Sequence, residues 1–323
     1  MITSGELDIL AIGEILVDFI SGDVCEDLSS AFTYHRFIGG SPVNIAINGA
    51  RLGGRTGVIA RAGTDFLGDY LEGELKACGV DTTGLSRDPT ANTSIIFVSR
   101  TCGTPCYEAF RNSDYQLSPD MIDADMIRKT RLVHSSAFAL SREPLRSSVL
   151  KVFRLAREMG LTVSFDPNYR EKIWPDRHEA MRIIQEAYSY ADITKPSLDD
   201  AVNIFGPGLS PSEYASRFAR MGPSTVVLTM GEKGALLCRD ELPTVMIPAR
   251  RVDVQDVTGA GDAFWAAFLM GHLDGLGGED GVLFAREIVA MKLSRIGPLP
   301  ESIDRESLYS QIPRFREEVR ATI

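Results

Sequence analysis

From residue 131 onward, short apolar runs alternate with amphipathic stretches of helical length. Strands are expected at 161–165, 192–194 and 225–229, and helices at 143–159, 177–188, 197–205 and 212–220. An earlier apolar run, Leu7–Ile12, predicts another buried strand. Because parallel strands need a long crossover connection, which is usually a helix, this alternation predicts an α/β fold with a mostly parallel sheet and helices on both faces.

The size and composition of the chain fit one compact domain. Its 323 residues could form one large α/β domain or two smaller ones. No internal repeat, low-complexity tract or linker divides it, so a single domain over residues 1–323 is expected. The net charge of −10 argues against nucleic-acid and membrane partners, because both need a basic face.

The cysteines and the N-terminal residues favour the cytoplasm. The five cysteines include no Cys-x-x-Cys pair and are expected to be thiols in a reducing compartment. Four acidic residues among the first 20 argue against a signal peptide, and no uncharged apolar run approaches a membrane span. The four histidines show no metal-ligand spacing, so no catalytic metal on His or Cys is expected.

A glycine-rich turn lies between an apolar alternation and a helical pattern. Val252, Val254 and Val257 predict a strand, and Gly259-Ala260-Gly261 predicts a tight turn into a helix. Backbone N–H groups at a helix N-terminus attract anions, and glycine lets an anion approach. Asp262 follows directly. An anion site beside a carboxylate suits phosphoryl transfer, in which the carboxylate accepts the proton of the attacking hydroxyl.

A second glycine turn precedes a helix near the N-terminus of the chain. In Gly39-Gly40-Ser41-Pro42, the serine is a favourable N-cap and the proline suits the first helical position, so a helix is expected over 42–52. Asn44 would point toward the helix mouth. Asp18 follows the first strand, near the carboxyl edge of the sheet, where open parallel sheets bind ligands.

The strings Gly39-Gly40-x3-Asn44 and Asp256-x-Thr258-Gly-Ala-Gly-Asp262 resemble the two signatures of the PfkB/ribokinase family of sugar kinases. The resemblance implies a ribokinase-like three-layer αβα domain and transfer of the γ-phosphoryl group of MgATP to a primary sugar hydroxyl. Asp262 would be the base, with N–H groups of Gly259, Ala260 and Gly261 holding the phosphoryl oxygens. The sugar would contact Asp18, Gly39, Gly40 and Asn44. No Walker-type string occurs, which argues against a P-loop kinase.

A hairpin is expected from strands at 93–99 and 106–111 joined by a turn at 101–105. Together with 15–38, the segment 92–118 would form a small sheet beside the main domain. In the family this sheet is a lid over the sugar, and Arg111 resembles a sugar-contacting residue of it. The alternative for Arg111 is an exposed charge at a strand end. The open edges of such a sheet could be covered by a second copy, which would give a homodimer.

Two segments after predicted strands point to the substrate. Asp166-Pro-Asn168-Tyr-Arg170 resembles a segment of fructokinases and 2-keto-3-deoxygluconate kinases, which implies substrate contacts from Asn168 and Arg170. The alternative for Arg170 is a structural ion pair. In Lys195-x-Ser197-x-x-Asp200, serine and aspartate replace the Asn and Glu usual in the family, a variation that resembles fructokinases.

The nucleotide side is also implied by resemblance. The string Thr-x-Gly-x-x-Gly over 229–234 resembles a turn on the nucleotide side, and the turn at 295–297 resembles the one that closes the nucleotide pocket. The residues expected to contact ATP are Lys195, Thr229, Gly231, Gly234, Thr258 and Gly297. Mg²⁺ would arrive with ATP. Asp256 resembles the family's ligand for a monovalent cation such as K⁺. Arg286 and Glu287 stand where the family often has an adenine-contacting Asn, so no adenine contact is expected from them.

Fructose is the expected substrate, with fructose 6-phosphate as product. Arg111 and Arg170 could instead hold the carboxylate of 2-keto-3-deoxygluconate. Ser141-Arg-Glu-Pro144 resembles 5-dehydro-2-deoxygluconate kinases. A sugar sensor without turnover is a further alternative, which the intact Asp262 and anion turn argue against. A dinucleotide-dependent oxidoreductase is disfavoured because Gly13-Glu-Ile-Leu16 lacks the Gly-x-Gly-x-x-Gly string.

Overall fold

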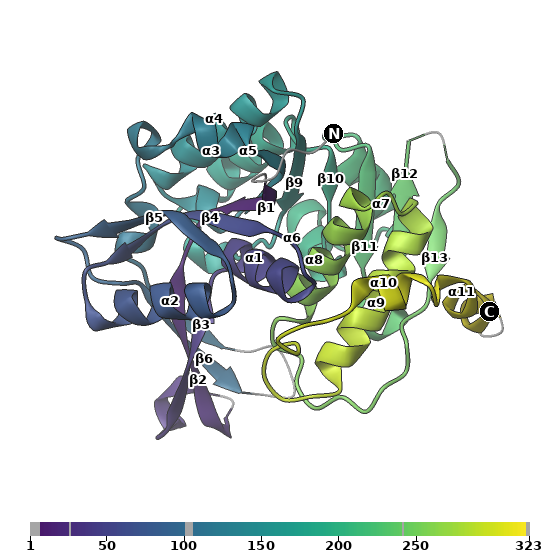
Figure 1. Ribbon diagram of the computed structural model, residues 1–323, viewed down its shortest axis with the longest axis horizontal. Helices are drawn as coiled ribbons and strands as arrows, with labels where there is room; N and C mark the ends of the chain where they lie inside the picture. Colours follow the sequence, from purple (N-terminus) through teal and green to yellow (C-terminus); the bar gives the residue numbers. More distant parts are fainter. Residues whose placement is uncertain (1–6, 26, 101–105, 241, 321–323) are drawn as a thin grey trace.

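A single large sheet forms the centre of the molecule (Figure 1). The computed structural model describes residues 7–25, 27–100, 106–240 and 242–320. Within them, the nine strands of this sheet lie in the order β13-β12-β11-β10-β9-β8-β1-β4-β5. They are β1 (Leu7–Ile12), β4 (Thr56–Gly63), β5 (Asp81–Asp88), β8 (Thr130–Ser136), β9 (Thr162–Asp166), β10 (Ile193–Thr194), β11 (Thr225–Thr229), β12 (Ala235–Arg239) and β13 (Val245–Ile247). The pairs β11–β12 and β12–β13 are antiparallel and the others parallel, so the expected mostly parallel sheet is confirmed.

Helices cover both faces of the sheet, as the alternation predicts. One face carries α3 (Ala124–Arg128), α4 (Leu145–Glu158), α5 (Arg177–Tyr188), α6 (Leu198–Phe205) and α7 (Pro211–Ala219). The other carries α1 (Ser41–Arg51), α2 (Phe66–Ala77), α8 (Ala260–Leu273) and α9 (Gly278–Leu293), with α10 (Arg305–Tyr309) and α11 (Ile312–Arg320) packed outside α9. Among the described helices, none has the length and apolarity that crossing a bilayer would require.

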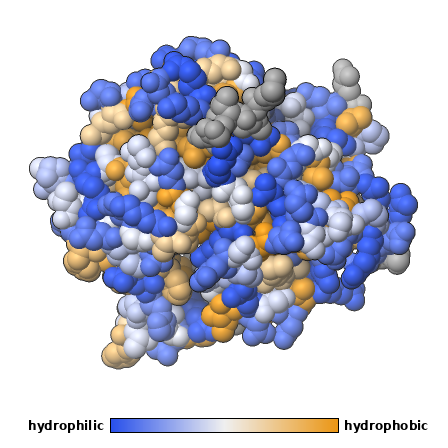
Figure 2. Space-filling view, viewed as in Figure 1, coloured by the Kyte–Doolittle hydropathy of each residue, from blue (hydrophilic) through white to orange (hydrophobic). Residues whose placement is uncertain are grey.

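A second, smaller sheet projects from the main one (Figure 1). Its strands are β2 (Leu16–Val24), β3 (Tyr34–Gly39), β6 (Ile95–Arg100) and β7 (Tyr107–Phe110), in the order β3-β2-β6-β7. Phe97 lies at its centre, with ring centroids 5.4 Å from Phe19 and 5.0 Å from Tyr34. We call this sheet the lid. Figure 2 shows apolar side chains at its tip, at the lower left. The turn expected at 101–105 lies outside the described residues.

Two local expectations are wrong. The strand expected around Val252, Val254 and Val257 is absent, because this segment follows β13 without pairing to a strand, and Val254 and Val257 are 51% and 62% exposed. Ser41 is not the N-cap of α1: the cap is Gly40, with φ 108°, and Ser41 is already helical.

Candidate active site

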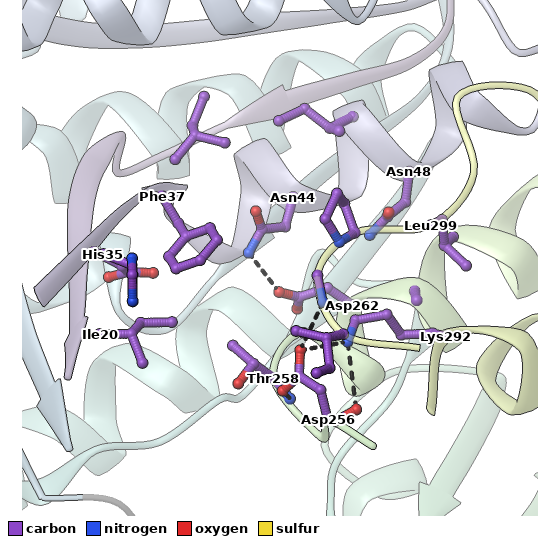
Figure 3. Close-up of a pocket in the computed structure, with 18 of the residues that line it drawn as sticks. Ile20, His35, Phe37, Asn44, Asn48, Asp256, Thr258, Asp262, Lys292 and Leu299 are labelled. Carbon is purple, nitrogen blue, oxygen red and sulfur yellow. Dashed lines mark hydrogen bonds and ion pairs between the residues drawn. The ribbon is translucent and has the colours of Figure 1, made fainter. Parts of the chain in front are cut away.

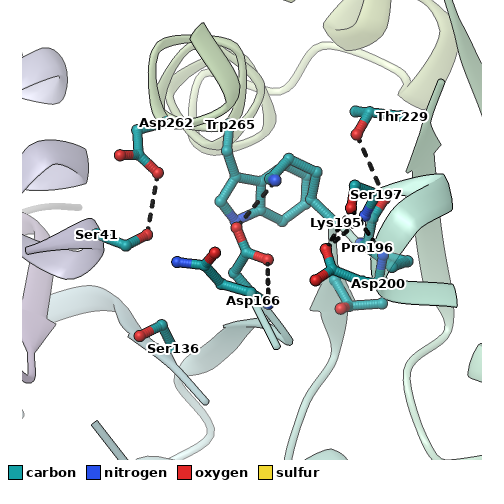
Figure 4. Close-up of polar contacts among 12 residues, drawn as sticks. Ser41, Ser136, Asp166, Lys195, Pro196, Ser197, Asp200, Thr229, Asp262 and Trp265 are labelled. Atoms are coloured by element: carbon teal, nitrogen blue, oxygen red, sulfur yellow. Dashed lines mark hydrogen bonds and ion pairs between the residues drawn. The ribbon is translucent and has the colours of Figure 1, made fainter. Parts of the chain in front are cut away.

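Two helix N-termini meet at Asp262, which lies in the first turn of α8 (Figures 3 and 4). Its Oδ1 accepts a hydrogen bond from Ser41 Oγ at 3.0 Å, and its Oδ2 accepts one from Asn44 Nδ2 at 2.9 Å. Both donors belong to the first turns of α1, which packs against α8. The carboxylate is therefore held in one orientation by two side chains of another helix.

Glu14 explains why the Ser41 hydroxyl is available to Asp262. Its Oε1 accepts the Ser41 N–H at 3.0 Å, so this carboxyl performs the capping role predicted for the serine side chain. A Cβ at Gly40 would lie 2.2 Å from the Glu14 carbonyl oxygen, so glycine is needed there. Burial raises the pKa of Glu14 to about 8.

Asp18 and Asp262 line the same cavity of about 650 Å³. The lid contributes Asp18, His35 and Phe37 to the lining, and α1 contributes Asn44. Burial raises the pKa of Asp18 to about 7, and the negative charge of Asp262 adds to this effect. A Cβ at Gly39 would lie 2.4 Å from Asp18 Oδ2, so the glycine leaves room for the carboxylate. The cavity thus has a carboxylate on the lid and another on the main domain.

A fixed positive charge lies beside the glycine turn of α8. Lys195 is buried, its Nζ lies 2.9 Å from Asp166 Oδ2, and a Cβ at Gly261 would be 3.6 Å from the same Nζ (Figure 4). Burial lowers the pKa of Lys195, but the charges of Asp166 and Asp200 outweigh it and the net pKa is raised. Lys195 and the positive end of α8 therefore lie side by side, an arrangement that suits an anion.

Burial also raises the pKa of Asp262, while the hydrogen bonds from Asn44 and Ser41 and the charges of Lys195 and Arg170 act in the opposite direction. The net pKa lies above the usual value, which makes Asp262 a better proton acceptor than an exposed aspartate. Of the three predicted phosphoryl-holding N–H groups, that of Ala260 already donates to Val257 O at 3.2 Å.

Ser197 and Asp200, which replace the family's Asn and Glu, form a capping box at α6. Asp200 Oδ2 accepts from the Ser197 N–H at 2.9 Å and from its Oγ at 2.6 Å, and Oδ1 accepts from the Tyr169 N–H at 2.8 Å. This buried carboxylate is engaged by protein donors. In the part of the chain that the structure describes, no group of three or more His, Cys, Asp or Glu side chains could hold a metal ion.

The two arginines predicted at the substrate differ in their surroundings. The Arg111 side chain is 2% exposed, pairs with Asp114 at 2.6 Å and lies over the Phe138 ring. The alternative of an exposed charge at a strand end is therefore wrong, and a sugar contact from Arg111 stays a prediction. Arg170 is exposed. Burial raises the pKa of Asp262 and that of the lid residue Tyr107, and the positive charge of Arg170 lowers both pKa values. Arg170 is thus close enough to both Asp262 and the lid for its charge to act on them.

The remaining predicted residues fall into three places. Asn168 follows β9 with φ 27°, a left-handed conformation rare outside glycine, and its N–H donates to Asp166 Oδ1 at 3.0 Å. Thr258 and Gly297 line the same cavity as Asp262. Thr229, Gly231 and Gly234 lie at the turn between β11 and β12. The roles of all these residues toward substrates stay predictions.

Asp256 is the residue predicted to hold a monovalent cation. Its Oδ2 accepts from Lys292 Nζ at 3.0 Å and from the Gly297 N–H at 3.3 Å, and its Oδ1 accepts from the Thr258 N–H at 2.9 Å (Figure 3). Sequence reasoning missed Lys292, Glu14 and the contact of Ser41 with Asp262. Two sequence signals could have identified the first two: Lys292 lies within an apolar helical pattern, and Glu14 lies within the apolar segment Ile12–Leu16.

The chain is similar to known proteins over most of its length. The model of the family described as pfkB family carbohydrate kinase matches residues 6–303. The chain is 33% identical to the ATP-dependent 6-phosphofructokinase of Thermoanaerobacterium thermosaccharolyticum over 94% of this chain and 93% of that protein. It is 34% identical to a probable fructokinase of Arabidopsis thaliana over 82% of each. The structure of Halothermothrix orenii fructokinase is similar with a TM-score of 0.79 and 38% identity, covering 91% of this chain and 100% of that one.

Proposed function

The chain belongs to the pfkB family of carbohydrate kinases, and from this premise we propose that it phosphorylates the 6-hydroxyl of fructose with MgATP. The observation that carries the proposal is the meeting of Asp262 with Ser41 and Asn44 beside Lys195 and the N-terminus of α8. Two features support fructose: fructokinases stand among the similar proteins, and the segment 195–200 resembles that of fructokinases.

The chemistry follows from the positions of the charges. Asp262 orients the sugar hydroxyl and accepts its proton as the hydroxyl oxygen bonds to the γ-phosphorus and the bond between the γ-phosphorus and the bridging oxygen of ADP breaks. Lys195 and the N-terminus of α8 stabilise the negative charge on the phosphoryl oxygens. Asp18 would accept hydrogen bonds from sugar hydroxyls on the lid side. Closure of the lid would exclude water, which otherwise competes as acceptor.

ATP enters as the second substrate, with Mg²⁺ bound to its phosphates and to water. Asp200 is engaged in the capping box, and Asp166 is paired with Lys195. Neither carboxylate is placed as a ready ligand for Mg²⁺, so the chain's direct contribution to the triphosphate is the positive charge of Lys195 and of the N-terminus of α8. The resemblance also implies K⁺ at Asp256, but the Lys292 ammonium already contacts that carboxylate.

An acidic sugar is the second candidate, because Arg170 lies near both Asp262 and the lid. It could pair with the carboxylate of 2-keto-3-deoxygluconate or with the phosphate of fructose 6-phosphate, the latter suggested by the name of the Thermoanaerobacterium relative. Arg111 is committed to Asp114, so a clamp made of both arginines would need that pair to open.

The test is a coupled assay of ADP release with fructose, fructose 6-phosphate, ribose, 2-keto-3-deoxygluconate and 5-dehydro-2-deoxygluconate. We expect fructose to give the highest kcat/KM, and Asp262→Ala to lower kcat by about 10²–10⁴-fold. An acidic sugar that outruns fructose, and that loses this advantage in Arg170→Gln, would replace fructose as substrate. If every sugar raises Tm and none releases ADP, the chain is a sensor.

A further inference from the structure

Lys292 places an ammonium group beside two loops that line the cavity, the loop before α8 and the loop after α9. It belongs to the last turn of α9 and is 4% exposed. Its Nζ donates to Asp256 Oδ2 at 3.0 Å and to the Asp256 carbonyl oxygen at 3.4 Å. One charged group thus contacts a carboxylate and a main-chain carbonyl of the same residue (Figure 3).

Asp256 joins the loop before α8 to the loop after α9. Its carboxylate accepts the Thr258 N–H on the first loop and the Gly297 N–H on the second. A further hydrogen bond joins the first loop to the end of α9, because the Gln255 N–H donates to the carbonyl oxygen of Leu293 at 2.7 Å. The first loop continues into Gly259, where α8 begins. The conformation of the glycine turn therefore depends on the charge balance at Asp256.

Oxygen atoms of a carboxylate and a carbonyl are the ligands that a monovalent cation such as K⁺ would use. Here the same two oxygens of Asp256 already face a compact positive charge that carries three donors. A K⁺ ion bound to them would lie against the ammonium group, and the two like charges would repel at close range, where Lys292 is buried and the Asp256 side chain is 22% exposed. The residues present do not fit the cation that the family resemblance implies.

We propose that the Lys292 ammonium replaces the monovalent cation of this site, so that the kinase works without K⁺. Lys292 acts as a positioning residue: it neutralises Asp256 and holds the loop that leads into the glycine turn. The proposal rests on the chain being a kinase of this family, and it is independent of which sugar is the substrate.

The first experiment measures Tm without substrates in matched concentrations of potassium and sodium chloride. The wild type should have the same Tm in both salts. Lys292→Met, which leaves Asp256 without its ammonium partner, should have a lower Tm in sodium and recover part of the loss in potassium. Lys151→Met is the matched control: Lys151 Nζ also donates to a backbone carbonyl, that of Pro119, on the opposite face of the sheet. It should show no difference between the salts.

The second experiment measures kcat with whichever sugar of the panel supports ADP release. The wild-type rate should change by less than about two-fold between the salts, whereas Lys292→Met should be about ten-fold slower in sodium and partly restored by potassium. A saturable, many-fold activation of the wild type by potassium would overturn the proposal. So would full activity of Lys292→Met without a response to potassium.

The experiments distinguish failure of the proposed kinase function from failure of the proposed role of Lys292. If no sugar is phosphorylated, the proposed function falls and the Tm comparison still decides the role of Lys292. If Lys292→Met does not fold in either salt, the potassium titration of the wild type decides it alone, because that titration needs no variant.

Discussion

At the residue scale, the carboxyl groups around the cavity hold their protons with different strengths. Burial raises the pKa of Glu14 to about 8, that of Asp18 to about 7 and that of Asp166 to about 6. The positive charge of Lys195 limits the rise in the pKa of Asp166, whereas the negative charge of Asp262 further raises the pKa of Asp18. Between Asp18 and Asp166, the lower pKa of Asp166 follows from the positive charge of Lys195, which opposes the effect of burial.

Asp18→Asn should separate stability from function. The folded state binds the proton of Asp18 more tightly than the unfolded state, so the wild type loses stability as pH rises from about 4 through about 7. The variant should therefore be more stable than the wild type by about 1–2 kcal/mol at pH ~8 and equal at pH ~4. Its kcat/KM for sugar should fall about ten-fold or more, because the amide cannot accept as a carboxylate does.

Urea unfolding across this pH range is the measurement. Asp23→Asn is the control, because Asp23 lies on the same strand and is exposed. A pH-independent difference between Asp18→Asn and the wild type would contradict the assigned pKa shift. In the wild type, kcat/KM should fall as pH drops below about 7, where Asp18 becomes protonated.

Ser41→Ala tests whether the second donor to Asp262 matters. Loss of a hydrogen bond to a charged acceptor is worth about 1.5 kcal/mol, which predicts a kcat about ten-fold lower with little change in the KM for ATP. Ser136→Ala is the matched control, because Ser136 is buried and donates to Glu14 only. Equal effects of the two substitutions would show that Ser41 acts through packing.

At the element scale, helix N-termini organise the site, and each is satisfied differently. α1 uses the carboxyl of Glu14, α6 uses the capping box of Ser197 and Asp200, and α8 begins at Gly259 with φ 70° and has no side-chain cap. The N-terminus of α8 lines the cavity through Gly259, Asp262 and Ala263. An N-terminus without a side-chain cap is available for phosphate, whereas the capped ends stabilise the fold.

Asp200→Ala should act on stability and leave the dependence of the rate on Mg²⁺ unchanged. The substitution removes the acceptor of three donors in a buried capping box, so we expect a loss of about 2–3 kcal/mol. Glu213→Ala removes the acid of the exposed capping box of α7 and should cost clearly less stability than Asp200→Ala. Denaturant unfolding and a Mg²⁺ titration of kcat measure both effects. A many-fold higher Mg²⁺ requirement in Asp200→Ala would assign the carboxylate to the metal.

At the scale of the whole molecule, one continuous sheet with packed helices on each face predicts a single cooperative unit. Three hydrophobic clusters line the two faces, and the strand β1 contributes to each of them through Leu10, Ile9 and Ala11. Calorimetry should therefore show one unfolding transition. Hydrogen exchange should be fastest in the lid strands β3 and β7, which are edges of a small sheet, and should slow there when the sugar binds. Two separate transitions would contradict the single domain.

Much of the fold and part of the site could be predicted from the sequence. The periodicity of apolar residues and the turn-forming residues predicted the strand–helix alternation, the start of α6 and the glycine turn before Asp262. These features depend on neighbours within a few residues. The same short-range signals failed at Val252–Val257, where alternation without a partner strand does not make a strand.

Only the tertiary structure decided which side chains meet. Ser41 and Asp262 are 221 residues apart in sequence, and Lys292 reaches Asp256 from a different helix. These contacts exist because packing of α1 against α8 and of α8 against α9 aligns the helix ends, and that alignment depends on the whole core. The residues of the chemistry are local in sequence, whereas their orientation and charge environment are properties of the packed molecule.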